Sequence, residues 1–158
     1  MYPFVLKYIS KYDITSSRRL RYTGSRNRSR VVFDFATDVA TGTGKFYFVI
    51  PPELNGMNMV AVSAQVVTNG TTNVTNVDLH RCVAAASGAA CSSTVADMLS
   101  TNITIDSGEN STATAATAAV IDANCDDVAT GQIIRVDVDA KSTTAPKGLI
   151  VTLEFQLP

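Results

Sequence analysis

The sequence predicts an all-β fold, an antiparallel β-sandwich that carries an extended basic arm at its N-terminus. Three observations lead to this prediction. Short segments alternate apolar and polar residues with a period of two, which is typical of half-buried strands. Turn-forming Gly, Pro and Asn residues separate these segments. Positive charge is concentrated in the first thirty residues. We therefore divide the 158-residue chain into an arm, residues 1–30, and a sandwich body, residues 31–158.

The arm differs from the body in charge. Residues 1–30 hold eight of the thirteen basic residues and one of the fourteen acidic residues, so the arm is +7 and the remainder is −8. This asymmetry favours an arm that docks on something acidic, such as another copy of its own body, a partner shell or nucleic acid. The alternative is a solubilising terminus that is partly without fixed structure.

The start of the arm has a strand pattern of its own. Its apolar and aromatic residues alternate from Tyr2 to Ile9, and Pro3 restricts such a strand to the edge of a sheet. Residues 12–30 are a connector rich in Ser, Arg and Gly. The strand could add to the sheet of a neighbouring subunit or fold back on its own body. The predicted anchoring residues are Tyr2, Phe4, Leu6, Tyr8, Arg18, Arg19, Arg21, Arg26, Arg28 and Arg30.

Five segments of the body alternate as strands do. They are residues 31–35, 46–50, 60–66, 134–138 and 149–157, and the last two have the clearest pattern. Turn signals lie between them, for example at Asn69-Gly70, Ser107-Gly108 and Pro146-Lys147-Gly148. Two packed sheets close to a jelly roll would bury the alternating faces and leave loops at both ends for contacts.

Two segments of the body have weaker patterns. Val95–Leu99 predicts one short helix. The alanine- and threonine-rich run Ser111–Val120 predicts a loop or an edge strand, because Ala favours a helix and Thr does not.

The sequence does not support an enzyme. His80 shares a strand face with Cys82 but has no evident third group to orient it, which indicates a surface or groove histidine. Gly42–Lys45 lacks the glycine spacing of a phosphate loop and predicts a turn. The acid pairs Asp126/Asp127 and Asp137/Asp139 could hold calcium, but alternating acids of this kind are typical of a solvated strand face, so we predict no metal and no cofactor.

Cys82, Cys91 and Cys125 make an odd count of cysteines. Cys82 and Cys91 flank a loop of small residues and are suited to a bridge within one hairpin, which leaves Cys125 for a bond to a neighbouring chain. Three reduced thiols are the alternative.

No apolar run approaches the roughly 20 residues of a membrane helix, and Met1–Lys11 lacks the long apolar run of a signal peptide. We therefore expect a soluble protein with no membrane partner.

Five blocks of the sequence resemble small structural proteins of tailed bacteriophages. They span residues 96–109, 115–122, 126–131, 134–139 and 147–155, so the resemblance covers about residues 45–158. Those proteins are β-sandwich modules found as capsid decorations, head or collar fibres and tail-fibre parts. The resemblance implies a component of the virion and carries over no catalytic residues. The arginine-rich start and the cysteines depart from the pattern, as an anchored and cross-linked subunit would.

The resemblance leaves three functions open. We expect first an oligomeric capsid decoration or collar protein, assembled in the host cytoplasm, whose partners are other virion proteins such as capsid or neck subunits. The second is a receptor- or carbohydrate-binding fibre module that uses end loops such as Asn69–Asn73 or Ser107–Ser111, although these loops contain no aromatic residue. The third is an inner capsid protein whose arm binds nucleic acid. Six arginines over thirteen residues, with only Tyr22 among them, are too dilute to favour this role.

Overall fold

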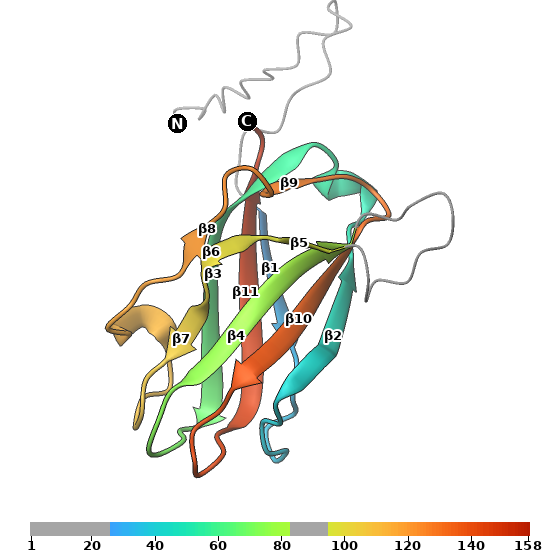
Figure 1. Ribbon diagram of the computed structural model, residues 1–158. Helices are drawn as coiled ribbons and strands as arrows, with labels where there is room; N and C mark the ends of the chain where they lie inside the picture. The colour runs from blue at the N-terminus through green and yellow to red at the C-terminus, as the bar shows by residue number, and fades with distance from the viewer. Residues whose placement is uncertain (1–25, 83–94) are drawn as a thin grey trace, which may run out of the picture.

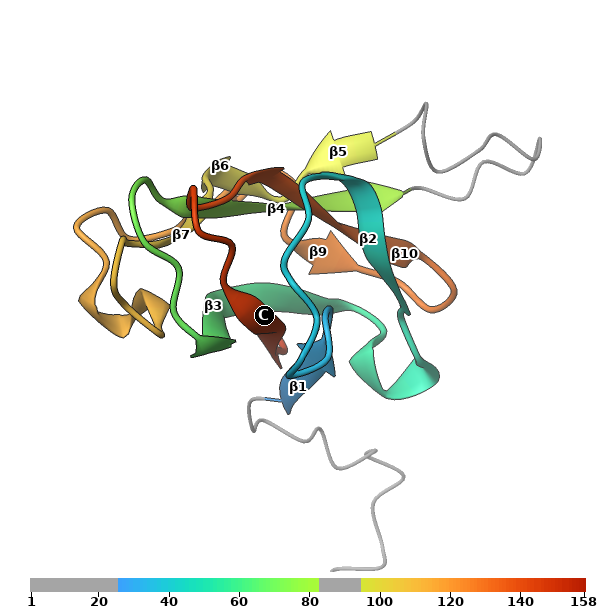
Figure 2. The same cartoon turned by 90° about the horizontal axis from the view of Figure 1, so that it is seen from below.

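The computed structural model describes residues 26–82 and 95–158 of the chain, and these form an antiparallel β-sandwich (Figures 1 and 2). One layer, which we call the β3 sheet, has the strand order β1 (Arg26–Val31), β11 (Lys147–Gln156), β3 (Met57–Thr68) and β9 (Asp127–Val128). The other layer, the β4 sheet, has the order β2 (Gly42–Val49), β10 (Ile133–Ala140), β4 (Thr75–Cys82) and β5 (Val95–Asp97). The predicted all-β sandwich is therefore confirmed.

Shorter elements complete the body. β7 (Ile103–Ile105) pairs with the first half of β4, while β5 pairs with its second half. β6 (Leu99–Thr101) and β8 (Val120–Ile121) form a small separate sheet. The 3₁₀ turns η1 (Pro52–Leu54) and η2 (Thr112–Thr114) precede β3 and follow β7.

The predicted alternation at the C-terminus places the core. Ile134, Val136 and Val138 of β10 are buried toward the β3 sheet, and Leu149, Val151, Leu153 and Phe155 of β11 face them. Because side chains alternate between faces along a strand, one face of each strand supplies the core. These side chains stabilise the fold mainly because folding removes their apolar surface from water.

The strand predicted at residues 31–35 is only partly present. β1 ends at Val31, and the Phe35 side chain is 74% exposed rather than buried. Asp34 causes the break, because its Oδ1 accepts hydrogen bonds from the backbone N–H groups of Ala36 and Thr37 and from Thr37 Oγ1. These bonds also lower the pKa of Asp34, with the Thr37 hydroxyl as the largest cause.

The helix predicted at Val95–Leu99 is wrong. Val95–Asp97 form β5, where Asp97 pairs with His80, and Leu99 begins β6. Between the two strands the Met98 N–H donates to Leu79 O at 2.9 Å. Five residues are too few to stabilise a helix alone, so the available sheet edge decides their conformation. The run Ser111–Val120 is a loop with one 3₁₀ turn that reaches β8, as predicted.

The end of the predicted arm belongs to the body. β1 pairs with β11 from Arg26↔Phe155 to Val31↔Ile150, so Arg26, Arg28 and Arg30 lie in a strand of the sandwich. Sequence periodicity could not find β1, because its alternation is between arginines and small polar residues. The other predicted anchoring residues, Tyr2, Phe4, Leu6, Tyr8, Arg18, Arg19 and Arg21, lie outside the described residues.

The sandwich has two distinct ends. At the base, β1 begins beside the last residues of β11, and η1 and the turn between β9 and β10 lie close by. At the opposite, distal end lie the loops that join β1 to β2, β3 to β4, β7 to η2 and β10 to β11 (Figure 1). No helix among the described residues has the length and apolar character needed to span a membrane.

Candidate functional site

The distal end brings together the two loops that the sequence singled out for binding. The Thr72 N–H donates to Ser107 Oγ at 2.8 Å, and the Gly108 N–H donates to Gly70 O at 2.9 Å. Asn69 Nδ2 also donates to Gly108 O at 3.1 Å. Three hydrogen bonds thus join the loop after β3 to the loop after β7.

A third loop, residues 141–146, completes this surface. The Thr143 N–H donates to Thr72 O at 2.8 Å, and Asn73 Nδ2 donates to Thr143 Oγ1 at 3.1 Å. Ser142 is buried beneath the loops and donates to Asn73 O at 3.0 Å. A Cβ atom at Gly70 would lie only 2.5 Å from Ser142 Cβ, so glycine is required there by close approach. We call these three connected loops, residues 69–74, 106–111 and 141–146, the distal loops.

The distal loops hold two non-glycine residues in the left-handed region. Thr72 has φ +60° and Asn73 has φ +67°. Asn tolerates this conformation, whereas a β-branched residue such as Thr rarely adopts it and is strained there. The cross-loop hydrogen bonds of Thr72 hold the strained backbone in place, and such strain is concentrated at functional sites.

Phe35 lies at the same end of the molecule. Gly148, at the start of β11, has φ +68°, and a Cβ there would lie 2.7 Å from Val67 Cγ2 and 2.9 Å from Phe35 Cα. The backbone of Phe35 therefore packs closely on β11 beside β3 while its ring stays exposed. The sequence pattern missed this exposed aromatic residue because it assigned Phe35 to a buried strand face.

The basic residues of β1 face the interior. Arg26, Arg28 and Arg30 pair with Phe155, Leu153 and Val151, which are all buried, and residues directly opposite in a sheet share a face. The Arg30 guanidinium lies 4.4 Å from the ring centre of Phe48 in the opposite sheet. Arg28 Nη2 is 3.3 Å from Glu53 Oε1 in η1. These contacts connect the edge strand of one sheet to the other layer.

A charged network lies on the outer face of the β4 sheet. Arg135 and Asp137, in β10, are only 5% and 3% exposed, and Arg135 Nη2 donates to Asp137 Oδ2 at 2.7 Å. The Gly44 N–H, at the start of β2, donates to Asp137 Oδ1 at 2.6 Å. The expectation that Asp137 and Asp139 form a solvated face is therefore wrong for Asp137, whereas Asp139 is exposed.

His80 extends this network to β4 and β5. Its Nε2 lies 3.1 Å from Asp137 Oδ2, and its Nδ1 lies 2.7 Å from Asp97 Oδ1. The Nδ1 contact is an electrostatic one, since it falls outside hydrogen-bond geometry. The sequence expectation that His80 lacks an orienting group is wrong, because Asp97 and Asp137 come from other strands. Asp78 lies opposite Asp137, and burial raises the pKa of its carboxyl, while the hydrogen bond from the Leu79 N–H opposes that shift.

This network fits a structural role better than a catalytic one. It contains carboxylates, a guanidinium and an imidazole, and the neighbouring Cys82 is disulfide-bonded. Its hydrogen bonds and ion pairs connect β2, β10, β4 and β5. Nothing in residues 26–82 and 95–158 groups three or more His, Cys, Asp or Glu side chains suitably for a metal ion.

The acid pair at Asp126 and Asp127 is occupied by an arginine. Arg81 points inward from β4 and donates from Nη1 to both the backbone O and Oδ1 of Asp127 in β9. Asp126 contributes its backbone O, which accepts from the Met59 N–H at 2.8 Å. These contacts join the two sheets at the base and leave Asp127 committed to Arg81.

The described cysteines lie at the base. Cys82 ends β4, as predicted, and is disulfide-bonded. Cys125, in the loop before β9, is a partly exposed free thiol. Cys91 lies outside the described residues, so the pairing of Cys82 with Cys91 stays a prediction.

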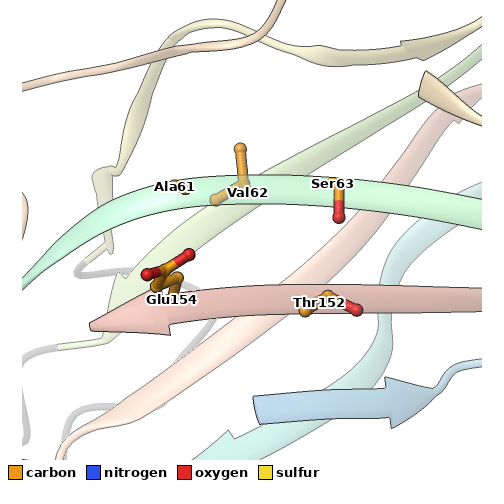
Figure 3. A pocket seen from close by; sticks show the side chains of 5 residues that line it. All are labelled: Ala61, Val62, Ser63, Thr152 and Glu154. Carbon is orange, nitrogen blue, oxygen red and sulfur yellow. The ribbon is translucent and has the colours of Figure 1, made fainter. Parts of the chain in front are cut away.

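A depression of about 210 Å³ lies on the outer face of the β3 sheet (Figure 3). It is lined by Ala61, Val62 and Ser63 of β3 and by Thr152 and Glu154 of β11. Glu154 is the one ionisable side chain in this lining.

No family model, no curated protein and no solved structure matches this chain.

Proposed function

We propose that the protein is a structural protein of a tailed bacteriophage virion, an oligomeric capsid decoration or collar protein without enzymatic activity that attaches through its N-terminal arm. The observation that carries this proposal is the strand order. The strand pairs are nested along the chain: β1 with β11, β2 with β10, β3 with β9 and, innermost, β4 with β5. These orders support our proposal that the chain is wound as a jelly roll, an architecture that viral capsid proteins share with lectin domains.

The two ends of the sandwich support end-on attachment. The described chain enters the body at Arg26, at the base, and Cys125 lies at the same end. β1 is an edge strand of its sheet, so an added strand from a neighbouring copy has a place to pair. An arm rich in arginine would give long-range attraction to an acidic shell, and strand pairing would then hold the subunit.

Attachment to particles that lack this protein tests the proposal. We expect residues 26–158 to unfold cooperatively yet fail to attach, because they retain all described strands and lack most of the arm's charge. The full chain with Arg18, Arg19 and Arg21 changed to Gln is the matched variant, and it should attach more slowly. The docking rate of the unmodified chain should fall as salt increases, since exposed charges are screened. Full attachment by residues 26–158 would contradict a role for the arm.

The free thiol gives a second test of assembly. In an oxidising medium we expect Cys125 to bond to an adjacent chain, so mature particles should show covalent multimers on non-reducing gels. Cys125→Ser should abolish the multimers without changing the melting temperature. If Cys82→Ser abolished them and Cys125→Ser did not, the pairing would be reassigned, and monomers alone would contradict the cross-link.

The second candidate, a receptor- or carbohydrate-binding module, is favoured by one specific observation. The two loops that the sequence named for it, Asn69–Asn73 and Ser107–Ser111, are joined by hydrogen bonds at the end opposite the base. A nucleic-acid-binding arm is not favoured, because Arg28 and Arg30 contact Glu53 and Phe48 within the body.

A further inference from the structure

We propose that the distal end binds a neutral glycan, which stacks on the exposed ring of Phe35 and hydrogen bonds to hydroxyl and amide groups of the distal loops. This inference rests on the second candidate function, recognition of a surface, and does not depend on attachment through the arm. It names the class of ligand that the side chains at this end are suited to bind.

Several polar groups of the distal loops are available to a ligand. Thr71, Thr72 and Thr144 are exposed, and their hydroxyl groups make no hydrogen bond within the described part of the chain. Asn73 uses its Nδ2 on Thr143 and leaves Oδ1 open. Hydroxyl and amide groups donate and accept without carrying charge, and they match the hydroxyl groups of a sugar.

The acidic side chains at the distal end favour a neutral glycan over an acidic one. Asp34, Asp38, Asp106 and Glu109 lie in the loops at this end, against Lys141 and the adjacent Lys45 and Lys147. Lys147 is already 3.4 Å from Asp38. The excess of acidic residues would repel a sulfated or sialylated chain.

The backbone of the distal loops is preorganised for binding. The cross-loop bonds between Thr72, Ser107 and Thr143, together with the close contact of Gly70 on Ser142, already fix the backbone of the distal loops. A ligand that binds to a surface already held in this way loses less affinity to ordering. This explains why strain at Thr72 persists although an Asn or Gly would relieve it.

Phe35 provides an exposed aromatic ring on which a sugar can stack. Sugar rings present C–H faces that pack on aromatic rings, and the sequence offers no aromatic residue within the distal loops themselves. Phe35 supplies a ring from the loop between β1 and β2, at the same end. A single ring and a few hydroxyl groups give weak binding per subunit, which many copies on one particle would strengthen.

The test uses the free, full-length protein without particles, so its outcome is separate from that of the attachment experiment. The probes are neutral hexose and N-acetylhexosamine oligosaccharides, with chondroitin sulfate fragments as the anionic comparison, followed by isothermal titration and ligand-observed NMR. We expect millimolar binding to at least one neutral probe and none to the anionic one. Phe35→Ala and Thr144→Val should each lower the affinity for the neutral oligosaccharide, and Phe35→Ala should lower it by about tenfold or more.

Two variants control for surface changes elsewhere. Val49→Ala removes an exposed apolar side chain from β2, and Thr130→Val removes a hydroxyl at the base. Both should bind as the unmodified chain does. Three results would overturn the proposal. They are no binding to any neutral probe at millimolar concentration, tighter binding to the anionic probe, and binding of the Phe35→Ala and Thr144→Val variants as tight as that of the unmodified chain.

Discussion

The base and the distal end of this sandwich are stabilised by different chemistry. At the base, Arg30 contacts Phe48 and Arg81 contacts Asp127 across the two layers, and Arg28 contacts Glu53 in η1. At the distal end, neutral backbone and hydroxyl groups join the distal loops, and the charged pair there, Lys147 with Asp38, is exposed. The base is thus suited to a permanent attachment that involves charge, while the distal loops present a rigid surface of uncharged hydroxyl and amide groups with acidic residues around it.

Removal of β1 should have the largest effect on this arrangement. We expect residues 32–158 to lose cooperative thermal unfolding, because the backbone groups of β11 lose their partners and Val151, Leu153 and Phe155 lose their cover. Residues 26–158 should melt like the full chain. Circular dichroism melts of both fragments test this, and equal melting temperatures would show that β1 adds nothing to the body.

Loss of one partner from the buried ion pair comes next. Asp137→Ala removes the carboxylate that accepts hydrogen bonds from the buried Arg135 guanidinium and from the Gly44 N–H, so we expect a loss of about 3–5 kcal/mol of unfolding free energy. Asp38→Ala breaks the exposed pair with Lys147 and should cost less than about 1 kcal/mol. Urea denaturation measures both, and similar costs would mean that burial of Asp137 does not matter.

A substitution at Gly70 probes the distal end. Gly70→Ala places a methyl group against Ser142 and the backbone O of Thr144, and we expect a cost of about 1–3 kcal/mol. The matched control is Gly108→Asn, since Gly108 has φ +83° with open space beside it and Asn tolerates that conformation, so its cost should stay below about 1 kcal/mol. If Gly70→Ala cost no more than the control, the loops would not be tightly packed.

Asp78 should produce the smallest effect, and it depends on pH. Burial raises its pKa in the folded state above the ordinary value of 3.8, so the folded protein binds more protons than the unfolded chain just above that pH. Stability should therefore fall as pH rises from 3.8 through the raised pKa. Asp78→Asn should remove this part of the slope in melts from acid to neutral pH. If the difference in melting temperature between the unmodified protein and Asp78→Asn stayed the same across that pH range, the raised pKa would not belong to Asp78.

Local pattern was sufficient where a strand has one apolar face. β10 and β11 could be predicted because Ile134, Val136 and Val138, and likewise Leu149 to Phe155, repeat with a period of two. Pattern was insufficient for β1, whose inward residues are arginines, and for Val95–Leu99, whose conformation is set by its partners in β4 and β8. Phe35 fits an alternating pattern, but the hydrogen bonds of Asp34 end the strand before it.

By itself, therefore, the sequence determined the all-β sandwich, the core faces of β10 and β11 and the segregation of charge, because burial of one strand face demands alternation and charge can be counted. The tertiary structure decided which distant residues meet. Only the pairing of β10 with β4 and β2 shows that Arg135 and Asp137 are buried beside His80. Only the return of β3, β7 and β10 to one end shows that Thr72, Ser107 and Thr143 form one surface. Such contacts join residues 35 to 71 positions apart, beyond the range of any local pattern.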